Sequence, residues 1–363
     1  MDAGQEETEK LLEQIEKDVI DFYSVAKDDI EKKFNEFNRK FNIKDEVKRK
    51  QLKAGEITQK EYSDWLAGQI IAGERWKEQL EVLSTDLLNA HNIAKSMVNG
   101  YMPEMYAIGH NYGTYQVEKI AKLSGSYTLY DRQTVERLIK DNPDLLPALK
   151  PMSEAARRIA DGRIKAWNKK QIQSTCLQGI LQGESIPEIA ERISNITGQE
   201  AKSTIRYART MTTGAENAGR VNGYKRAEKM GIEMEQQWLA TLDSRTRHSH
   251  RDLDGEHVKV GEEFSNGCAY PGDPNGPPSE IWCCRCSLVP MLTGIPELEE
   301  RNDLSNISER DTSHMEELTY ADWKKGKEKP QPIEKQKKTG ETIKWKFINE
   351  YKRAAERLKD VKA

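Results

Sequence analysis

The chain has 363 residues, which leaves room for two or three domains, and a formal net charge of -3, which excludes a strong overall attraction to nucleic acid or anionic membranes. Charged residues make up 32% of the sequence and hydrophobic residues 36%, with a mean hydropathy of -0.84. This composition is polar for a compact globule, so it favours elongated helices with a large surface or a core that partner subunits complete.

No stretch approaches the roughly 18 to 20 apolar residues of a transmembrane helix, so we expect no membrane partner. Residues 1–7 are acidic and lack the apolar centre of a secretory signal. We therefore expect the protein to stay in the cytosol where it is made, with its thiols reduced. Clustered cysteines in that compartment favour a metal site over disulfides.

The first 125 residues predict a series of helices. Apolar residues recur every three or four positions from Leu11 to Phe22, from Ile30 to Phe41 and from Tyr62 to Leu83. We expect Thr85 or Asp86 to cap the helix that follows. Most of these apolar positions are expected in a core or a helix–helix seam, and a surface for an oligomeric partner is the alternative.

Proline, glycine and capping residues define the next helices. Pro103 suits a first helical turn. A short helix is expected from Thr134 to Lys140, and a long one from about Ser153 to Gln182, where a glycine stops it. Ser185 to Glu188 has the form of a capping box with proline in the first turn. The helix that begins there should close near Gly198.

The spacing of apolar residues then changes from helical to alternating, which marks the start of a region with strands. A long helix is expected from Gln199 to Met230, with small residues on its buried face and a glycine after its end. Beyond it, apolar and polar residues alternate over 232–240 and 257–260, which predicts strands, and 287–292 suits a closing strand. We therefore expect an α+β module over about 195–295.

The last part of the chain has a different composition. From Tyr320 to Ala363 lysine and arginine outnumber the acidic residues, and lysines are dense over 324–338, beside two prolines. This composition favours a flexible basic linker. Apolar residues spaced from Trp345 to Leu358 then predict a terminal amphipathic helix.

Most of the cysteines and half of the histidines lie within residues 238–290. Zinc takes about four nitrogen or sulfur ligands in a tetrahedron. Cys284 and Cys286 can point to the same side of an extended segment, because side chains two residues apart share a face. The available ligands are His248, His250, His257, Cys268, Cys283, Cys284 and Cys286. We expect a structural zinc site made by His250, Cys268, Cys284 and Cys286, with Cys283 as a spare.

Other interpretations of this cluster stay open. Buried free cysteines pack as small hydrophobic residues, and two of them could instead form an oxidised pair. A cysteine nucleophile beside a histidine is a further alternative, although the sequence identifies no third group to orient the histidine.

Opposite charges are packed into a tight turn from Asp243 to Arg247. In the simpler interpretation, Asp243 accepts backbone N–H bonds and pairs with Arg245. In the other, Arg245 and Arg247 contact an anion or a nucleic acid. The preceding long helix carries cations at helical spacing, for which a solvated face is the common explanation: Arg206, Arg209 and Arg220.

A series of motifs in fixed order runs from this helix to the end of the module. They are Ala208-Arg-Thr210, Asn217, Arg220, Trp238, Thr241, Asp243-Ser-Arg-Thr-Arg247, His250, Gly255, Phe264, Tyr270-Pro-Gly-Asp273, Cys284-Arg-Cys286 and Pro290. In their order and spacing over about 183–290, the chain resembles the phage Mu protein F-like family. Members of that family are minor head or head-morphogenesis proteins of tailed bacteriophages and prophages.

The resemblance implies a phage head component present in few copies, whose partners are the portal protein at the DNA-entry vertex and other capsid or scaffold proteins. It implies a location in the virion head, and in the bacterial host cytoplasm during assembly. Some relatives bind DNA, and toxin domains follow this module in others. The basic residues here that could contact packaged DNA are Arg245, Arg247, Lys324, Lys325, Lys337 and Lys338.

The sequence thus predicts an α+β protein that is mostly α-helical and has an elongated N-terminal region. It also predicts a division of the chain into three parts. These are a helical partner-binding region over 1–150, the module over 151–295 with its candidate zinc site within 240–290, and a charged linker with a terminal helix over 296–363. The preferred function is structural, in head assembly, and not enzymatic, because thiolate-rich zinc sites are more often structural. The alternatives are a metal-dependent hydrolase or nuclease, and an effector delivered with phage DNA.

Overall fold

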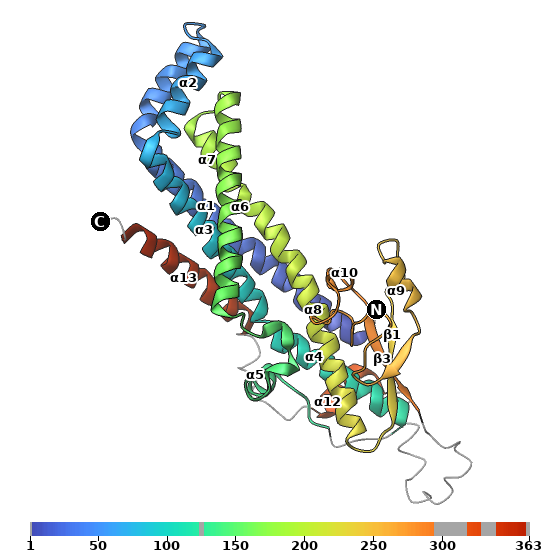
Figure 1. The fold of residues 1–363 in the computed structure, drawn as a ribbon. Coiled ribbons are helices and arrows are strands. Elements are labelled where there is room, and N and C mark those ends of the chain that lie inside the picture. Colours follow the sequence, from blue (N-terminus) through green and yellow to red (C-terminus); the bar gives the residue numbers. More distant parts are fainter. Residues whose placement is uncertain (1, 123–126, 294–317, 328–338, 361–363) are drawn as a thin grey trace, which may run out of the picture. The chain divides into compact units, whose positions relative to one another are not determined.

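The computed structural model describes residues 2–122, 127–293, 318–327 and 339–360 (Figure 1). The described residues are mostly helical and include a small antiparallel sheet, which confirms the predicted α+β class. No helix in this part of the chain is both long and apolar enough to cross a membrane.

The chain forms two compact units, and each of them is assembled from separate stretches of sequence. One unit contains Met1–Glu16, Val98–Lys150 and Arg206–Thr339. The other contains Lys17–Met97, Pro151–Ile205 and Gly340–Ala363. These units are defined by which residues pack together in space. The predicted parts, divided after residues 150 and 295, are contiguous ranges of the sequence, and this division stays a prediction.

The N-terminal helices follow the predicted periodicity with one exception. They are α1 (Ala3–Lys53), α2 (Gln59–Ile70), α3 (Gly73–Asn99) and α4 (Met102–Ala121), and Pro103 lies in the first turn of α4 as predicted. The cap predicted at Thr85 or Asp86 is wrong, because α3 continues through both residues. The Thr85 hydroxyl donates a hydrogen bond to the Glu81 carbonyl within α3, and the buried Asp86 carboxylate accepts one from Lys33 Nζ on α1 at 2.7 Å.

The middle of the chain contains α5 (Arg132–Asp141), two short 3-10 turns, η1 (Pro143–Leu145) and η2 (Pro147–Leu149), then α6 (Glu154–Gln182), α7 (Ile186–Ser194) and α8 (Ile196–Glu228). The Ser185–Glu188 capping box at the start of α7 is confirmed. The predicted boundary near Gly198 is wrong, since α7 ends at Ser194. Asn195, between the two helices, keeps a right-handed helical backbone, so α8 begins at once and includes Gly198.

The core of the second unit lies between α1, α2, α3, α6 and α7. These helices bury their apolar stripes against one another, as amphipathic patterning predicts. The buried side chains include Ile30, Phe34, Tyr62, Leu66, Leu83, Ile172, Ile180, Ile189 and Ile193.

The described strands form a three-stranded antiparallel sheet in the order β2-β1-β3. The strands are β1 (Met234–Leu239), β2 (His257–Lys259) and β3 (Ser287–Leu292), close to the predicted ranges. Gln236 on the central strand lies opposite Val258 and Pro290. Proline is compatible with β3 because that strand lies at the edge of the sheet. Two short helices, α9 (His248–Asp252) and α10 (Pro278–Ile281), lie in the connections.

Glycines on α4 and α8 permit a close crossing of these two helices. A methyl group added at Gly109 would lie 1.9 Å from the Glu216 carbonyl oxygen, and one added at Gly219 would lie 2.2 Å from that of Tyr106. Neither distance is compatible with a side chain, so the two helices meet backbone to backbone at these glycines.

The C-terminal part contains α12 (Tyr320–Lys327) and α13 (Thr339–Asp360). The terminal amphipathic helix is confirmed, and Tyr351 of α13 packs edge-on against Phe22 of α1 with ring centroids 5.5 Å apart. The predicted flexible linker is wrong for residues 320–327. Those residues are helical because Trp323 is buried beside Tyr115 and its Nε1 donates a hydrogen bond to Glu118 at 2.5 Å.

Candidate metal centre

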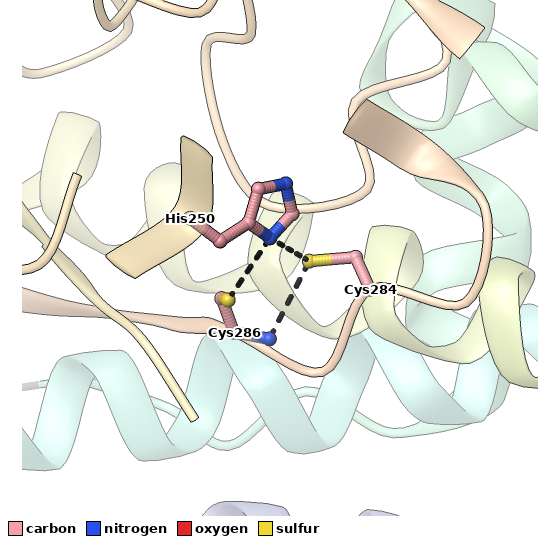
Figure 2. A group of neighbouring side chains, drawn as sticks. All are labelled: His250, Cys284 and Cys286. Carbon is pink, nitrogen blue, oxygen red and sulfur yellow. Dashed lines mark hydrogen bonds between the residues drawn. The ribbon is translucent and has the colours of Figure 1, made fainter. Parts of the chain in front are cut away.

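Three of the four predicted zinc ligands lie together at the end of the sheet. His250 Nδ1 lies 3.7 Å from Cys284 Sγ and 3.4 Å from Cys286 Sγ (Figure 2). The three possible ligand atoms all lie within 4.8 Å of one another. Each side chain is at most 3% exposed. The three residues thus form a buried cluster with a nitrogen and two sulfur donors.

The spacing of these donors fits a tetrahedral zinc site. Bonds of about 2.3 Å to sulfur and 2.0 Å to nitrogen place the ligands of a tetrahedron about 3.5 to 3.8 Å apart. The two nitrogen–sulfur distances, 3.4 and 3.7 Å, lie close to the lower value of about 3.5 Å, which applies to a nitrogen–sulfur pair. Cys268, the fourth predicted ligand, is fully buried but does not belong to this group. Its part in the site therefore stays a prediction.

The other candidate ligands lie elsewhere. His248 and Cys283 are exposed, and His257 on β2 pairs with Glu235 at 2.5 Å. Cys283 has a left-handed backbone with φ of 56°, and its N–H donates a hydrogen bond to Thr210 Oγ1 at 3.0 Å. This local turn directs Cys284 into the cluster while Cys283 faces outward.

Contacts with α8 hold the Cys284–Cys286 segment in place. The Thr213 hydroxyl donates a hydrogen bond to the Cys284 carbonyl at 2.7 Å, and Asn217 Nδ2 donates one to the Cys286 carbonyl at 3.2 Å. On the other side, the Trp238 ring lies edge-on to His250 with centroids 5.4 Å apart. Thr213, Asn217 and Trp238 therefore fix the backbone and the ring that present the three donors.

The two thiols of the cluster do not ionise alike. A hydrogen bond from Cys284, and the proximity of His250, lower the pKa of the Cys286 thiol to about 4. The same pairing, together with burial, raises the pKa of Cys284 well above its ordinary value. The pairing therefore favours ionisation of Cys286 over that of Cys284, and the thiolate is the form that binds a metal.

A carboxylate lies on the opposite side of the histidine ring. His250 Nε2 points away from both sulfurs (Figure 2), and Glu280 Oε2 of α10 lies 3.1 Å from it. Ser249 Oγ donates a hydrogen bond to the same carboxylate oxygen at 2.9 Å. A carboxylate in this position favours the tautomer with its proton on Nε2, which leaves Nδ1 free to face a metal. Sequence reasoning missed Glu280 because no motif links it to His250.

The turn after β1 is tied to the same segment. Arg285 forms two hydrogen bonds to the Asp243 carboxylate, at 2.5 and 2.8 Å, and these hold the pKa of Asp243 well below its usual range. Asp243 also accepts the Arg245 N–H at 2.8 Å, as the simpler interpretation predicted. Arg245 also forms the predicted ion pair with Asp243, at 3.9 Å, although its side chain is 74% exposed. Arg247 donates a hydrogen bond to the Trp282 carbonyl.

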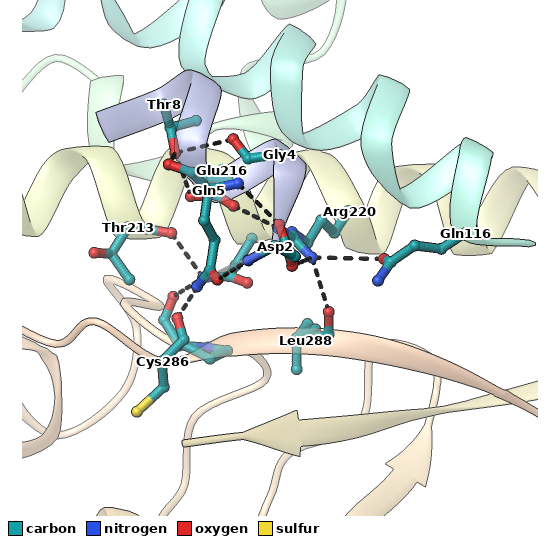
Figure 3. A network of polar contacts seen from close by, with 12 residues as sticks. Asp2, Gly4, Gln5, Thr8, Gln116, Thr213, Glu216, Arg220, Cys286 and Leu288 are labelled. Atoms are coloured by element: carbon teal, nitrogen blue, oxygen red, sulfur yellow. Dashed lines mark hydrogen bonds and ion pairs between the residues drawn. The ribbon is translucent and has the colours of Figure 1, made fainter. Parts of the chain in front are cut away.

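Arg206 and Arg209 of α8 are exposed, as a solvated basic face predicts, but Arg220 is not. Its side chain is fully buried and forms two hydrogen bonds to Asp2, both at 2.9 Å (Figure 3). It also bonds Glu216 at 2.6 Å and the Leu288 carbonyl on β3 at 3.1 Å. Burial alone would lower the pKa of Arg220, but Glu216 and Asp2 raise it above its ordinary value. Arg220 thereby joins the start of α1 to the sheet.

The predicted nucleic-acid contacts are dispersed in the sequence, and the structure describes four of the six. Arg245 is exposed, and Arg247 is half-buried. Lys324 pairs with Glu7, whereas Lys325 is exposed on α12. Lys337 and Lys338 lie outside the described residues.

One stretch of the sequence, which contains α8 and the histidine–cysteine cluster, matches a known protein family. Residues 170–289 match the family model described as phage Mu protein F like protein. This part of the chain is therefore similar to that phage protein family, and the resemblance found in the sequence is confirmed.

Two curated relatives extend the comparison. The minor head protein GP7 of Bacillus phage SPP1 is 24% identical over 334 residues, which are 89% of this chain and 97% of that protein. The NAD(+)--arginine ADP-ribosyltransferase EFV of Enterococcus faecalis (strain ATCC 700802 / V583) is 28% identical over 227 residues, which are 61% of this chain. That match spans only 44% of the relative's length. No solved structure matches the chain significantly.

Proposed function

We propose that this protein is a minor head protein of a tailed bacteriophage or prophage, and that it acts in head morphogenesis at the portal vertex. The observation that carries the proposal is the extent of the similarity to the SPP1 minor head protein, which spans 89% of this chain and 97% of the relative. The protein would then reside in the virion head, and in the host cytoplasm during assembly. Its partners would be the portal protein and other capsid or scaffold proteins.

The test is co-expression of the full chain with the portal protein of the same phage, followed by purification through a tag on the portal. We expect the two proteins to copurify, and deletion of the gene to reduce the yield of infectious heads. Heads that form and package DNA normally without the protein would contradict the proposal.

The histidine–cysteine cluster supports a structural zinc site within this function. His250, Cys284 and Cys286 would supply three ligands, and Cys268 is the proposed fourth. A zinc ion held there would cross-link α9 to the segment before β3, in a module whose sheet is too small to bury a large core. A closed set of four protein ligands would leave no position for a substrate.

A nonspecific contact with packaged DNA is a further part of the proposal. The exposed Arg245 and Lys325, together with Arg247, Lys324, Lys337 and Lys338, are the residues proposed for it. Such a contact would be electrostatic and would weaken steeply with salt.

The ADP-ribosyltransferase relative favours the alternative of an enzyme or effector delivered with phage DNA. The match covers 44% of that relative, so the activity in its name can reside in the part of the relative that lies outside the match. Incubation of the full chain with labelled NAD+ and a host lysate distinguishes the two functions. We expect no label on any protein, and labelling that requires the wild-type chain would favour the effector.

A further inference from the structure

Helix α6 has two faces of different character. One face packs within its own unit, and its residues include Asn168, Ile172, Cys176, Gly179 and Ile180, all buried. On the opposite face, every third or fourth residue is exposed. That exposed row consists of Ala156, Ile159, Arg163, Trp167, Lys170, Ser174, Leu177 and Leu181.

The exposed row is unusually apolar for a surface. The exposed fractions of Ile159, Trp167, Leu177 and Leu181 are 58%, 39%, 48% and 66%. Single exposed apolar residues are common on protein surfaces. Here the four large side chains share one face at the spacing of a helix–helix seam, and the buried seam of the same helix lies opposite. A second apolar seam on a helix that already contributes to a core indicates a binding surface.

The charges on this face have one sign. Arg163 and Lys170 lie within the row, and neither has an ion-pair partner among the described residues. The carboxylates of α6 lie away from the row and are engaged, Glu154 by Arg158 and Asp161 by Asn92. The face is therefore apolar and positive, which suits a partner that brings both apolar side chains and carboxylates.

We propose that this face of α6 binds an amphipathic helix of another phage head protein, with acidic residues opposite Arg163 and Lys170. From Ile159 to Leu181 the row is about 33 Å long, which matches a partner helix of roughly 22 residues. Helices with apolar residues at such spacing bind in this way to complementary apolar faces. That the partner is a head protein rests on the proposed function, whereas its chemistry follows from the face itself.

A second copy of this chain fits the face poorly. In an antiparallel pair of α6 helices centred on the row, whose midpoint between Ile159 and Leu181 is Lys170, the Lys170 side chains of the two copies would lie opposite each other. In a parallel pair, Arg163 and Lys170 would each lie opposite their own counterparts. Both arrangements place cation against cation, which opposes binding.

The test measures binding of the full-length chain to the purified portal protein and to the purified major head protein of the same phage. Two double variants alter the face, Ile159→Ser with Leu177→Ser, and Arg163→Glu with Lys170→Glu. The control is Ile43→Ser with Val47→Ser, which removes apolar side chains of α1 that are 77% and 52% exposed. Because all of these residues are exposed, circular dichroism should show unchanged helix content and thermal unfolding.

We expect both α6 variants to weaken binding to one of the two proteins by at least about tenfold, and the control to bind as the wild type does. Wild-type binding that neither α6 variant weakens would overturn this inference and leave the proposed function standing. Failure of the wild type to bind either protein would overturn the partner class and the proposed portal contact together. Light scattering could also find that the wild type is a dimer and the Ile159/Leu177 variant a monomer. That result would show that a second copy of the chain occupies the face, and it would overturn the proposal.

Discussion

At the scale of single residues, the candidate site depends on groups that sequence motifs only partly reveal. His250, Cys284 and Cys286 could be predicted because their types and close spacing in the sequence indicate a metal site. Glu280 and the Asp243–Arg285 pair could not, because carboxylates and guanidinium groups are common in the sequence and only the fold selects their partners. The position of Cys268 depends on the loop over 267–278, whose path follows no periodic pattern.

The metal site leads to a first prediction. Mass spectrometry of the purified, reduced full chain should find about one zinc per chain, and Cys284→Ser should lose it. Glu280→Gln should weaken zinc affinity about 10- to 100-fold, because the carboxylate no longer holds His250 with Nδ1 toward the thiols. Glu262→Gln is the matched control, since Glu262 is exposed in the same module. Equal affinities in the two glutamate variants would exclude the orienting role of Glu280.

The buried Arg220 leads to a second prediction at this scale. Arg220→Met should lower the free energy of unfolding by about 3 to 5 kcal/mol, because Glu216 and Asp2 lose the cation that compensates their burial. Urea unfolding of the full chain measures this loss. Arg209→Met is the control, since Arg209 is 50% exposed in its pair with Glu16 and should cost less than about 1 kcal/mol. A similar cost for both variants would mean that the Arg220 network adds nothing to stability.

At the scale of elements, periodicity and capping residues predicted most helices and all the described strands closely. The errors fell where the tertiary structure overrides a local signal. Asp86 could have capped a helix, but a buried lysine holds it inside α3, and Gly198 does not interrupt α8. Residues 320–327 were predicted as linker because their three lysines continue into the lysine-rich stretch up to 338, whereas burial of Tyr320 and Trp323 makes them a helix.

The glycine crossing of α4 and α8 gives a prediction for these elements. Gly219→Ala should destabilise the protein by about 3 kcal/mol or more, because the added methyl would meet the rigid Tyr106 carbonyl and force the helices apart. Gly162→Ala on α6 is the control, since no atom lies within 4 Å of the added methyl. That change should stabilise the protein by about 0.5 to 1 kcal/mol through helix propensity. Thermal unfolding of both variants measures the difference, and the same sign for both would refute the tight crossing.

At the scale of the whole molecule, charge is distributed unevenly although the net value is only -3. The basic segment, residues 324–338, begins on α12 and ends before α13. The Trp323 side chain of α12 and the Tyr351 side chain of α13 are both buried. Truncation of the C-terminal region would therefore remove parts of both compact units as well as the lysines. Substitution is the cleaner way to separate charge from fold.

The prediction for DNA follows from this distribution. The triple variant Lys325→Ala, Lys337→Ala and Lys338→Ala should bind duplex DNA more weakly at low salt. The logarithm of the binding constant falls linearly with the logarithm of the salt concentration. The steepness of that line should decrease by as much as about 3 in the triple variant, because each lost phosphate contact removes about 0.9. Filter binding over a salt series measures this, with Lys10→Ala, Lys17→Ala and Lys40→Ala as a charge-matched control. Binding by the first variant equal to that of the wild type would exclude the basic segment as the contact.

The assembly of each compact unit from distant stretches has a consequence for synthesis of the protein. The Phe22 ring in α1 is made early, but Tyr351, against which it packs, is added 329 residues later. In the same way, Asp2 forms its ion pair with Arg220 only after Arg220 has been added to the chain. Such long separations delay the closing contacts of both units. The helices that are made first therefore keep apolar stripes uncovered until the last helix is made, and uncovered apolar surface of this kind favours aggregation.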